Sequence, residues 1–256
     1  MSDADIGLIL ADIVEEAGRL VLPYWSHGGT VAHTSKADMS PVTIADQEGE
    51  KLIVARLKEH FPDIAIVAEE AAAEFGTPDA IGDRFFLVDP VDGTKAFMRG
   101  DPSFTVNIGL VAGRRPVAGA VCAPASNETW FTTAGGTMKR AGGGPASPVR
   151  VRLWPNGEAV ALISHTMKEE TLAKLTVEYG FHRTLAMDSS VKLCRIAEGV
   201  ADIYPRHGPT SEWDICAAQA VLEAAGGSVT GYQGAEFLYG KADKRFLNEW
   251  FVARGG

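Results

Sequence analysis

Long apolar runs and cysteines are scarce in this sequence. No stretch approaches the roughly 18 consecutive apolar residues that a membrane-spanning helix needs, so we expect no transmembrane segment. Cys122, Cys194 and Cys216 are too few and too widely spaced for a disulfide framework or a zinc site, and we expect them to be buried thiols. The acidic start MSDAD also differs from the basic start of a signal peptide. These absences predict a cytoplasmic protein.

Basic residues are also in the minority. The chain has 24 Lys and Arg against 33 Asp and Glu, and a formal net charge of −9. A protein that binds nucleic-acid polymers needs a basic face, so the balance argues against that function. The same excess disfavours a phosphate-bearing substrate, unless clustered acids hold metal ions that reverse the local field. With 256 residues and 46% hydrophobic composition, the chain is long enough to bury a substantial core.

Several common catalytic motifs are missing. The histidines show no mutual metal-ligand spacing, and the glycines at 142–144 are not followed by the Lys-Ser/Thr of a phosphate-binding loop. The Ser164-His165 pair does not lie in a Gly-x-Ser-x-Gly motif, so a serine hydrolase is not supported.

The sequence pattern alternates between helical and strand-like segments. Helices are predicted over residues 4–22, 43–61, 168–179, 189–198 and 213–225, with another starting near Thr94, and strands over 64–67, 85–88, 104–111, 117–121, 128–131, 160–163 and 201–204. The glycine-rich stretch 135–148 is the best candidate for a boundary or an exposed hairpin. The pattern predicts a layered α+β or α/β sandwich in two packed halves, approximately 1–145 and 146–256.

The sharpest local feature is the sequence DPVDGT at residues 89–94. Pro90 fixes φ and Gly93 permits a tight turn. The turn can present two carboxylates and the Val91 carbonyl to one point, and such oxygen ligands suit a hard cation such as Mg²⁺. Taken alone, however, Asp-Pro and Asp-Gly are ordinary turn dipeptides.

Other acidic residues stand at the ends of predicted elements. Glu69 and Glu70 end a strand-like run, Asp214 begins a helix, and Asp46 follows Thr43 by three residues. Each has an ordinary explanation, namely a solvated turn, a favourable helix dipole or a capping box. Together they are what a site for several metal ions requires, because one carboxylate cannot hold two cations about 4 Å apart.

These motifs bring a known family into view. The sequences KADMSPVTIAD at 36–46, AEE at 68–70, DPVDGTKAF at 89–97 and WD at 213–214 resemble the inositol monophosphatase family. Within it, FTVNI at 104–108, SSVKLC at 189–194 and ADIYPR at 201–206 are most similar to the 3′(2′),5′-bisphosphate nucleotidase group. The resemblance implies an α-β-α-β-α sandwich. It also implies a Mg²⁺-dependent, lithium-sensitive phosphomonoesterase that removes the 3′-phosphate from adenosine 3′,5′-bisphosphate, a by-product of sulfate assimilation.

The resemblance also implies roles for individual residues. The implied groups are Asp46, Thr94 and Glu69 in catalysis, and Glu69, Asp89, the Val91 carbonyl, Asp92 and Asp214 as metal ligands. The expected phosphate or substrate contacts are Lys36, Gly93, Thr94, Ser189, Ser190, Lys192 and Arg206. Among these, the two serines open a predicted helix and the Lys192 and Arg206 side chains add positive charge, but Ser is also a common N-cap and Lys or Arg usually lies on a solvated face. Two Mg²⁺ ions would share Asp89, and a weaker third ion would share Glu69. Asp46 and Thr94 would orient and deprotonate a water molecule.

Two positions depart from the nucleotidase pattern. Asp188 stands where that group usually has Gly, and His207 where it has Phe. A carboxylate near a second phosphate is repulsive unless it caps the helix or faces away, so these departures bear on the exact substrate and leave the metal site unchanged.

Other functions fit parts of the same pattern. The nearest is an inositol-1-phosphatase, or a related sugar or histidinol phosphatase, with the same metal core. A non-catalytic module that binds divalent metal ions would keep the carboxylates without the water-activating pair, yet Asp46 and Thr94 are both present. The expected partner is a small phosphorylated substrate, and a homodimer is a reasonable default for the family.

Overall fold

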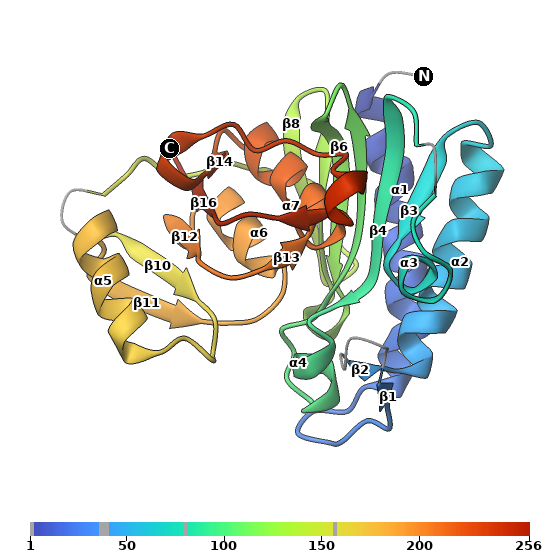
Figure 1. Cartoon of the computed structure of the whole chain (residues 1–256), viewed down its shortest axis with the longest axis horizontal. Coiled ribbons are helices and arrows are strands. Elements are labelled where there is room, and N and C mark those ends of the chain that lie inside the picture. The colour runs from blue at the N-terminus through green and yellow to red at the C-terminus, as the bar shows by residue number, and fades with distance from the viewer. Residues whose placement is uncertain (1–2, 36–40, 79–80, 156–157) are drawn as a thin grey trace.

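The first half of the chain builds a large sheet that carries two long helices on one face (Figure 1). The computed structural model describes residues 3–35, 41–78, 81–155 and 158–256. The helices are α1 (Asp3–Val21) and α2 (Ile44–His60), and the strands are β3 (Ala65–Ala68), β4 (Arg84–Asp92), β5 (Thr105–Ala112), β6 (Arg115–Ala123), β7 (Glu128–Thr133), β8 (Gly136–Ala141) and β9 (Ser147–Val149). The strands are hydrogen-bonded in that order. β3 and β4 run parallel, and the other neighbouring pairs are antiparallel.

Alternation along the strands gives this sheet two apolar faces. In β4, Phe86 and Val88 pack in the core with α1 and α2, whereas Phe85 and Leu87 belong to a second core on the opposite face. Successive side chains of a strand point to opposite faces. A strand that is buried on both faces therefore reads as the continuous apolar run that the sequence shows at 85–88.

The second half adds a smaller sheet and three further helices. Its strands are β10 (Val160–Ile163), β11 (Arg183–Ala186), β12 (Ile203–Arg206), β14 (Ser228–Gly231) and β16 (Phe251–Arg254), in the order β11-β10-β12-β16-β14. β10 is parallel to β11 and β12, whereas β16 is antiparallel to β12 and β14. The helices are α5 (Glu169–Tyr179), α6 (Val191–Ala197) and α7 (Glu212–Ala224).

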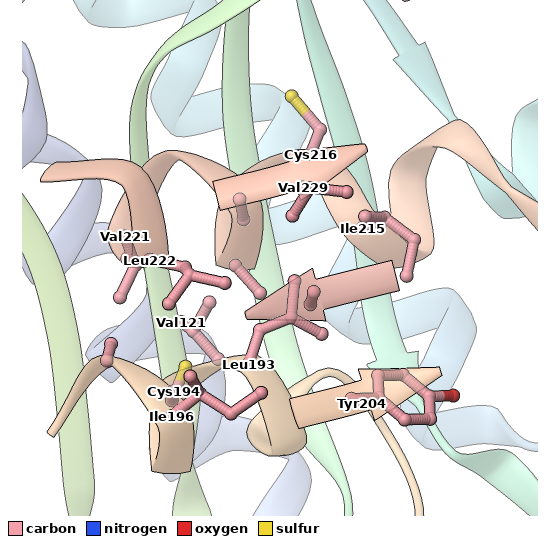
Figure 2. Close-up of a cluster of buried hydrophobic side chains, with 14 of the residues drawn as sticks. Val121, Leu193, Cys194, Ile196, Tyr204, Ile215, Cys216, Val221, Leu222 and Val229 are labelled. Carbon is pink, nitrogen blue, oxygen red and sulfur yellow. The ribbon is translucent and has the colours of Figure 1, made fainter. Parts of the chain in front are cut away.

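The helices α6 and α7 lie between the two sheets. Figure 2 shows Leu193 and Ile196 of α6 and Leu222 of α7 pointing into one apolar cluster with Val121 of β6. A Cβ atom on Gly119 of β6 would lie 2.5 Å from a backbone oxygen of α7, so this glycine lets the helix lie directly on the sheet. α5 packs on the outer face of the small sheet. The layers are therefore α-β-α-β-α, which confirms the predicted fold class.

Short elements complete the chain. They are α3 (Glu69–Phe75), α4 (Thr94–Met98), the antiparallel pair β1 (Thr34–Ser35) and β2 (Pro41–Val42), the antiparallel pair β13 (Thr210–Ser211) and β15 (Leu247–Asn248), and 3₁₀ turns at Leu22–Tyr24, Pro124–Ser126, Tyr232–Gly234 and Ala242–Lys244. The three cysteines are buried and free, as expected. In the part of the chain that the structure describes, no helix combines the length and apolar character that crossing a membrane requires.

Most predicted elements are present, with some differences. Glu69 and Glu70 are the first residues of helix α3, whereas one interpretation of the sequence placed them in a solvated turn. Strand β4 continues through residues 89–92, beyond the predicted strand at 85–88. The glycine-rich stretch 135–148 forms strand β8 and the start of the edge strand β9, so it belongs to a hairpin region. The sequence pattern did not predict β11, β14 or β16, which depend on pairing within the small sheet. The division into halves near residue 145 stays a prediction.

Candidate active site

The DPVDGT motif ends strand β4 and turns into α4. The pairing of β4 with β5 shifts register between Asp89 and Asp92, and the Val91 amide donates to Asp89 Oδ1 at 3.0 Å. Gly93 has φ of 87°, a left-handed conformation that favours glycine. A Cβ atom there would lie 3.0 Å from the Ser103 carbonyl oxygen. The turn therefore carries two carboxylates and depends on glycine for both its conformation and its clearance.

Three carboxylates from separate elements converge beside this turn. Glu69 is the first residue of α3, Asp89 lies in β4 and Asp214 is the third residue of α7. One ligand oxygen from each lies within 4.8 Å of the other two. β3 and β4 are parallel neighbours, so their ends bring Glu69 beside Asp89, whereas Asp214 comes from the second half of the chain. Such a set of oxygen donors fits a hard divalent cation.

Burial makes this cluster electrostatically unfavourable without a cation. Desolvation raises the pKa of Asp89 well above its ordinary value, and the charges of Glu69, Asp92 and Asp214 raise it further. The pKa of Asp214 is raised for the same reasons. Burial also raises the pKa of Asp92, an effect that the Lys192 charge and the Ser190 amide oppose. A bound cation offsets this repulsion, so the donor set fits a metal ion rather than an empty acidic cluster.

Asp46 both caps helix α2 and faces Thr94. Its Oδ2 accepts hydrogen bonds from the Thr43 amide at 2.8 Å and from the Thr43 hydroxyl, so the capping box predicted as the ordinary explanation is present. Its Oδ1 lies 3.4 Å from Thr94 Oγ1, which also lies 3.1 Å from the Val91 carbonyl oxygen. The capping contact uses one carboxylate oxygen of Asp46 and directs the other toward Thr94.

Glu50 is a further residue of the site, not predicted from the sequence, and it holds the start of helix α3. It lies one helical turn after Asp46 on α2 and is only 7% exposed. Its carboxylate accepts the Glu70 amide at 2.6 Å and the Ala71 amide at 2.8 Å. These amides belong to the first turn of α3, where the unpaired N–H groups favour a carboxylate. The sequence feature that could have indicated Glu50 is its spacing of four residues from Asp46, because this spacing places both side chains on one helix face.

A cavity of about 350 Å³ opens in front of the acids. The predicted residues that line it are Glu69, Asp92, Gly93, Thr94, Ser189, Ser190, Lys192, Arg206 and Asp214. Asp89, Asp46 and Val91 lie behind these residues and are buried. Lys36, the remaining predicted contact, lies outside the described residues.

Ser189 and Ser190, which precede α6, have different surroundings. Ser189 has φ of 57° and lines the cavity. The Ser190 amide donates to Asp92 Oδ2, and its hydroxyl donates to Asn107 Oδ1 at 2.9 Å. Ser190 is thus engaged with protein groups around Asp92, and α6 begins at Val191, two residues later than predicted.

The basic side of the cavity includes one buried lysine. Lys192 donates to the Met187 carbonyl oxygen at 3.1 Å and lies 4.9 Å from the Tyr204 ring centre. Burial lowers the pKa of Lys192 to about 8, although Asp92 and Asp188 oppose the shift. Arg206 lines the same cavity and donates to the Pro209 carbonyl oxygen at 3.0 Å.

The two departures from the nucleotidase pattern lie in different places. Asp188 lines the cavity and pairs with Arg99 at 2.9 Å, so it neither caps α6 nor faces away. His207 stacks on Trp250 with ring centres 4.6 Å apart and an angle of 10° between the rings. Only the first departure therefore changes the wall of this cavity.

Known proteins share this fold and these motifs. The Inositol monophosphatase family matches residues 6–250. The 3′(2′),5′-bisphosphate nucleotidase CysQ of Salmonella typhimurium is 33% identical over 242 residues, which are 94% of this chain and 96% of that protein. CysQ from Bacteroides thetaiotaomicron, a solved structure, is 30% identical with a TM-score of 0.79, covering 98% of this chain and 97% of that chain. Inositol monophosphatase 1 of Solanum lycopersicum is 30% identical over 240 residues, 90% of this chain and 85% of that protein.

The layered fold, the carboxylate cluster and these similarities together define a metal-dependent phosphatase architecture. The chain belongs to the inositol monophosphatase family and is a phosphomonoesterase of that family. The family acts on small phosphate esters, and Glu69, Asp89 and Asp214 are placed to hold its metal.

Proposed function

We propose that this protein is a Mg²⁺-dependent 3′(2′),5′-bisphosphate nucleotidase. It removes the 3′-phosphate of adenosine 3′,5′-bisphosphate, and of the related 5′-phosphosulfate, to leave the 5′-substituted nucleotide. The observation that carries the proposal is the convergence of Glu69, Asp89 and Asp214 within 4.8 Å at one end of a cavity whose wall also carries Lys192 and Arg206. Two CysQ proteins, each at least 30% identical over nearly the whole chain, support the substrate.

The metal ligands proposed from the sequence are compatible with this geometry. Glu69, Asp89 and the Val91 carbonyl would hold one Mg²⁺, while Asp89, Asp92 and Asp214 would hold a second; Glu69 would also contact a weaker third. Bound Mg²⁺ supplies positive charge for the phosphoryl group and lowers the pKa of a water molecule. The Val91 carbonyl oxygen has two lone pairs, so one remains for this role even when the Thr94 hydroxyl donates to Val91 instead of to Asp46.

Asp46 and Thr94 would position the attacking water. The Thr94 hydroxyl has one proton and lies 3.4 Å from Asp46 Oδ1. If it donates a hydrogen bond to Asp46, its oxygen lone pairs face the water and accept a hydrogen bond from it, which would orient the water for in-line attack. The proton that the water loses would pass to the Thr94 hydroxyl oxygen, while the proton of that hydroxyl moves on to the Asp46 carboxylate. The backbone amides of Gly93 and Thr94, at the start of α4, would bind the phosphate oxygens.

A phosphate-release panel tests the proposal. The purified protein is assayed with adenosine 3′,5′-bisphosphate, inositol 1-phosphate and histidinol phosphate, each with Mg²⁺, with EDTA, and with Mg²⁺ plus Li⁺. We expect the highest kcat/KM for the bisphosphate, no release with EDTA and inhibition by Li⁺. No release from the bisphosphate with Mg²⁺ present would exclude this function.

Two other functions have specific outcomes in the same panel. A higher kcat/KM for inositol 1-phosphate would assign an inositol monophosphatase, which the similarity to the Solanum lycopersicum protein supports. Mg²⁺ binding by calorimetry without hydrolysis of any ester would indicate a non-catalytic metal-binding module. A cytoplasmic location and a homodimer complete the proposal, and cell fractionation and light scattering test them.

A further inference from the structure

The cavity has two chemically different ends along helix α4. Gly93 and Thr94 line it where the helix begins, beside the acidic cluster, and Arg99 lines it directly after the helix ends. A helix rises about 1.5 Å per residue. The five residues of α4 therefore separate Arg99 from the start of the helix by roughly 7–8 Å along the axis. A substrate that placed its reacting phosphate at the acidic end could reach Arg99 with a group about that far from the phosphate.

Asp188 holds Arg99 at this far end. Asp188 Oδ2 accepts a hydrogen bond from Arg99 Nη2 at 2.9 Å. The same carboxylate lies 3.3 Å from His165 Nδ1 and 3.5 Å from Ser164 Oγ. Arg99 follows α4 in the first half of the chain, whereas the other three residues belong to the second half. At the far end of the cavity, the contact between Arg99 and Asp188 therefore joins the two halves of the chain.

Arg99 can bind an anion at this end although it is paired with Asp188. Lys192 and Arg206 add positive charge to the wall of the same cavity. The other carboxylates of that wall, Glu69, Asp92 and Asp214, belong to its acidic end. A guanidinium carries five N–H donors in a rigid fork, so a bond to Asp188 leaves donors for phosphate oxygens. The Arg99 side chain is 51% exposed, and its orientation in the cavity depends on a partner that restricts its rotamers.

We infer that Asp188 is a specificity-determining positioning residue, which holds the Arg99 guanidinium where it binds the second, remote phosphate of the substrate. This inference rests on the proposed bisphosphate substrate. It also explains how a carboxylate is accommodated where the nucleotidase group usually has Gly. Asp188 does not contact the remote phosphate itself, and it acts through the arginine that it orients.

Two substrates that differ only in the remote phosphate test this inference. Adenosine 3′,5′-bisphosphate and adenosine 3′-monophosphate carry the same scissile bond. We expect Arg99→Met to raise KM for the bisphosphate by about 10- to 100-fold, the effect of losing a charged hydrogen-bond donor, with kcat unchanged and KM for the monophosphate unchanged. Asp188→Asn should produce a smaller increase, and the double variant should resemble Arg99→Met, because the two residues act as one unit.

Two further measurements separate positioning from a purely structural role. The product 5′-AMP keeps the remote phosphate, so its inhibition constant should rise in both single variants. Lys174→Met is the matched control, since it removes an exposed ion pair with Glu170 on α5 and should leave all constants unchanged. Thermal unfolding checks that each variant is folded.

Three results would overturn the inference. A lower KM for the bisphosphate in Asp188→Asn would show that Asp188 acts mainly by repulsion. Equal changes for both substrates would show a structural role. A wild-type protein that hydrolyses neither nucleotide would exclude the proposed function itself, and with it the inference, whereas the first two results leave the proposed function standing.

Discussion

The Thr94 hydroxyl oxygen lies 3.4 Å from Asp46 Oδ1, although 48 positions separate the two residues in the chain. Each stands at the beginning of a helix, α2 for Asp46 and α4 for Thr94. Two helix starts thus meet beside the carboxylate cluster, and the second oxygen of Asp46 is fixed by Thr43.

Replacing Thr94 should affect catalysis without affecting metal binding. We expect Thr94→Ala to lower kcat roughly 100- to 1,000-fold, within the range for loss of a general acid–base group, while Thr94→Ser keeps most of the activity because it retains the hydroxyl. Steady-state kinetics at saturating Mg²⁺ measure the effect, and calorimetric Mg²⁺ affinity is the control. Equal kcat in the Ala and Ser variants would show that the hydroxyl is not used.

Asp92→Asn should nearly abolish turnover in a protein that still folds. Asp92 lines the cavity and is predicted to bind metal. Because burial raises the pKa of Asp92, removal of its charge should not lower the thermal midpoint of the metal-free protein. We expect kcat to fall by roughly 100-fold or more, because the proposed metal would lose a ligand and the reaction would lose the charge stabilisation that the metal supplies. Phosphate release and circular dichroism on the same sample measure both effects, and normal activity would contradict the assignment.

The stabilisation by Mg²⁺ should increase with pH. The pKa values of Asp89 and Asp214 are raised in the folded protein, so the folded state keeps protons that the unfolded state releases. Without metal, the stability from these groups is present at low pH and is lost as pH rises from the ordinary carboxyl range through the raised values. Mg²⁺ binds the deprotonated carboxylates. The rise in thermal midpoint on adding Mg²⁺ should therefore be larger at neutral pH than in the ordinary carboxyl range of about pH 4, as measured by scanning calorimetry, and an equal rise at both would contradict this account.

Glu50→Gln should weaken Mg²⁺ binding from a distance. The carboxylate accepts two amide hydrogen bonds from the first turn of α3, whereas a glutamine presents an NH₂ group that cannot accept. We expect Mg²⁺ affinity to fall about tenfold, typical of a lost supporting contact behind a metal ligand, with kcat near wild type at saturating Mg²⁺. Glu48→Gln is the matched control, because Glu48 is exposed on the same helix. Unchanged affinity in the Glu50 variant would show that α3 is held by other contacts.

Much of the local structure was predictable because its causes lie close together in the chain. The run at 85–88 is apolar because β4 is buried on both faces, and Gly93 stands where the chain needs a positive φ. The capping box of α2 is formed by Thr43 and Asp46, and that of α7 by Ser211 and Asp214. The two residues of each box are only three positions apart. By contrast, β14 and β16 are short strands whose pairing partners come from distant segments, so local propensity alone did not predict them.

The sequence by itself determined which acidic residues are present, which of them begin or end an element, and which family they resemble, because these are properties of neighbouring residues. Only the tertiary structure decided that Glu69, Asp89 and Asp214 lie within 4.8 Å of one another. It also decided that Glu50 holds the start of α3 and that Asp188 pairs with Arg99, 89 positions away. Long-range contacts of this kind form because the packing of five layers brings distant backbone segments together, and a pattern of neighbouring residues does not contain that information.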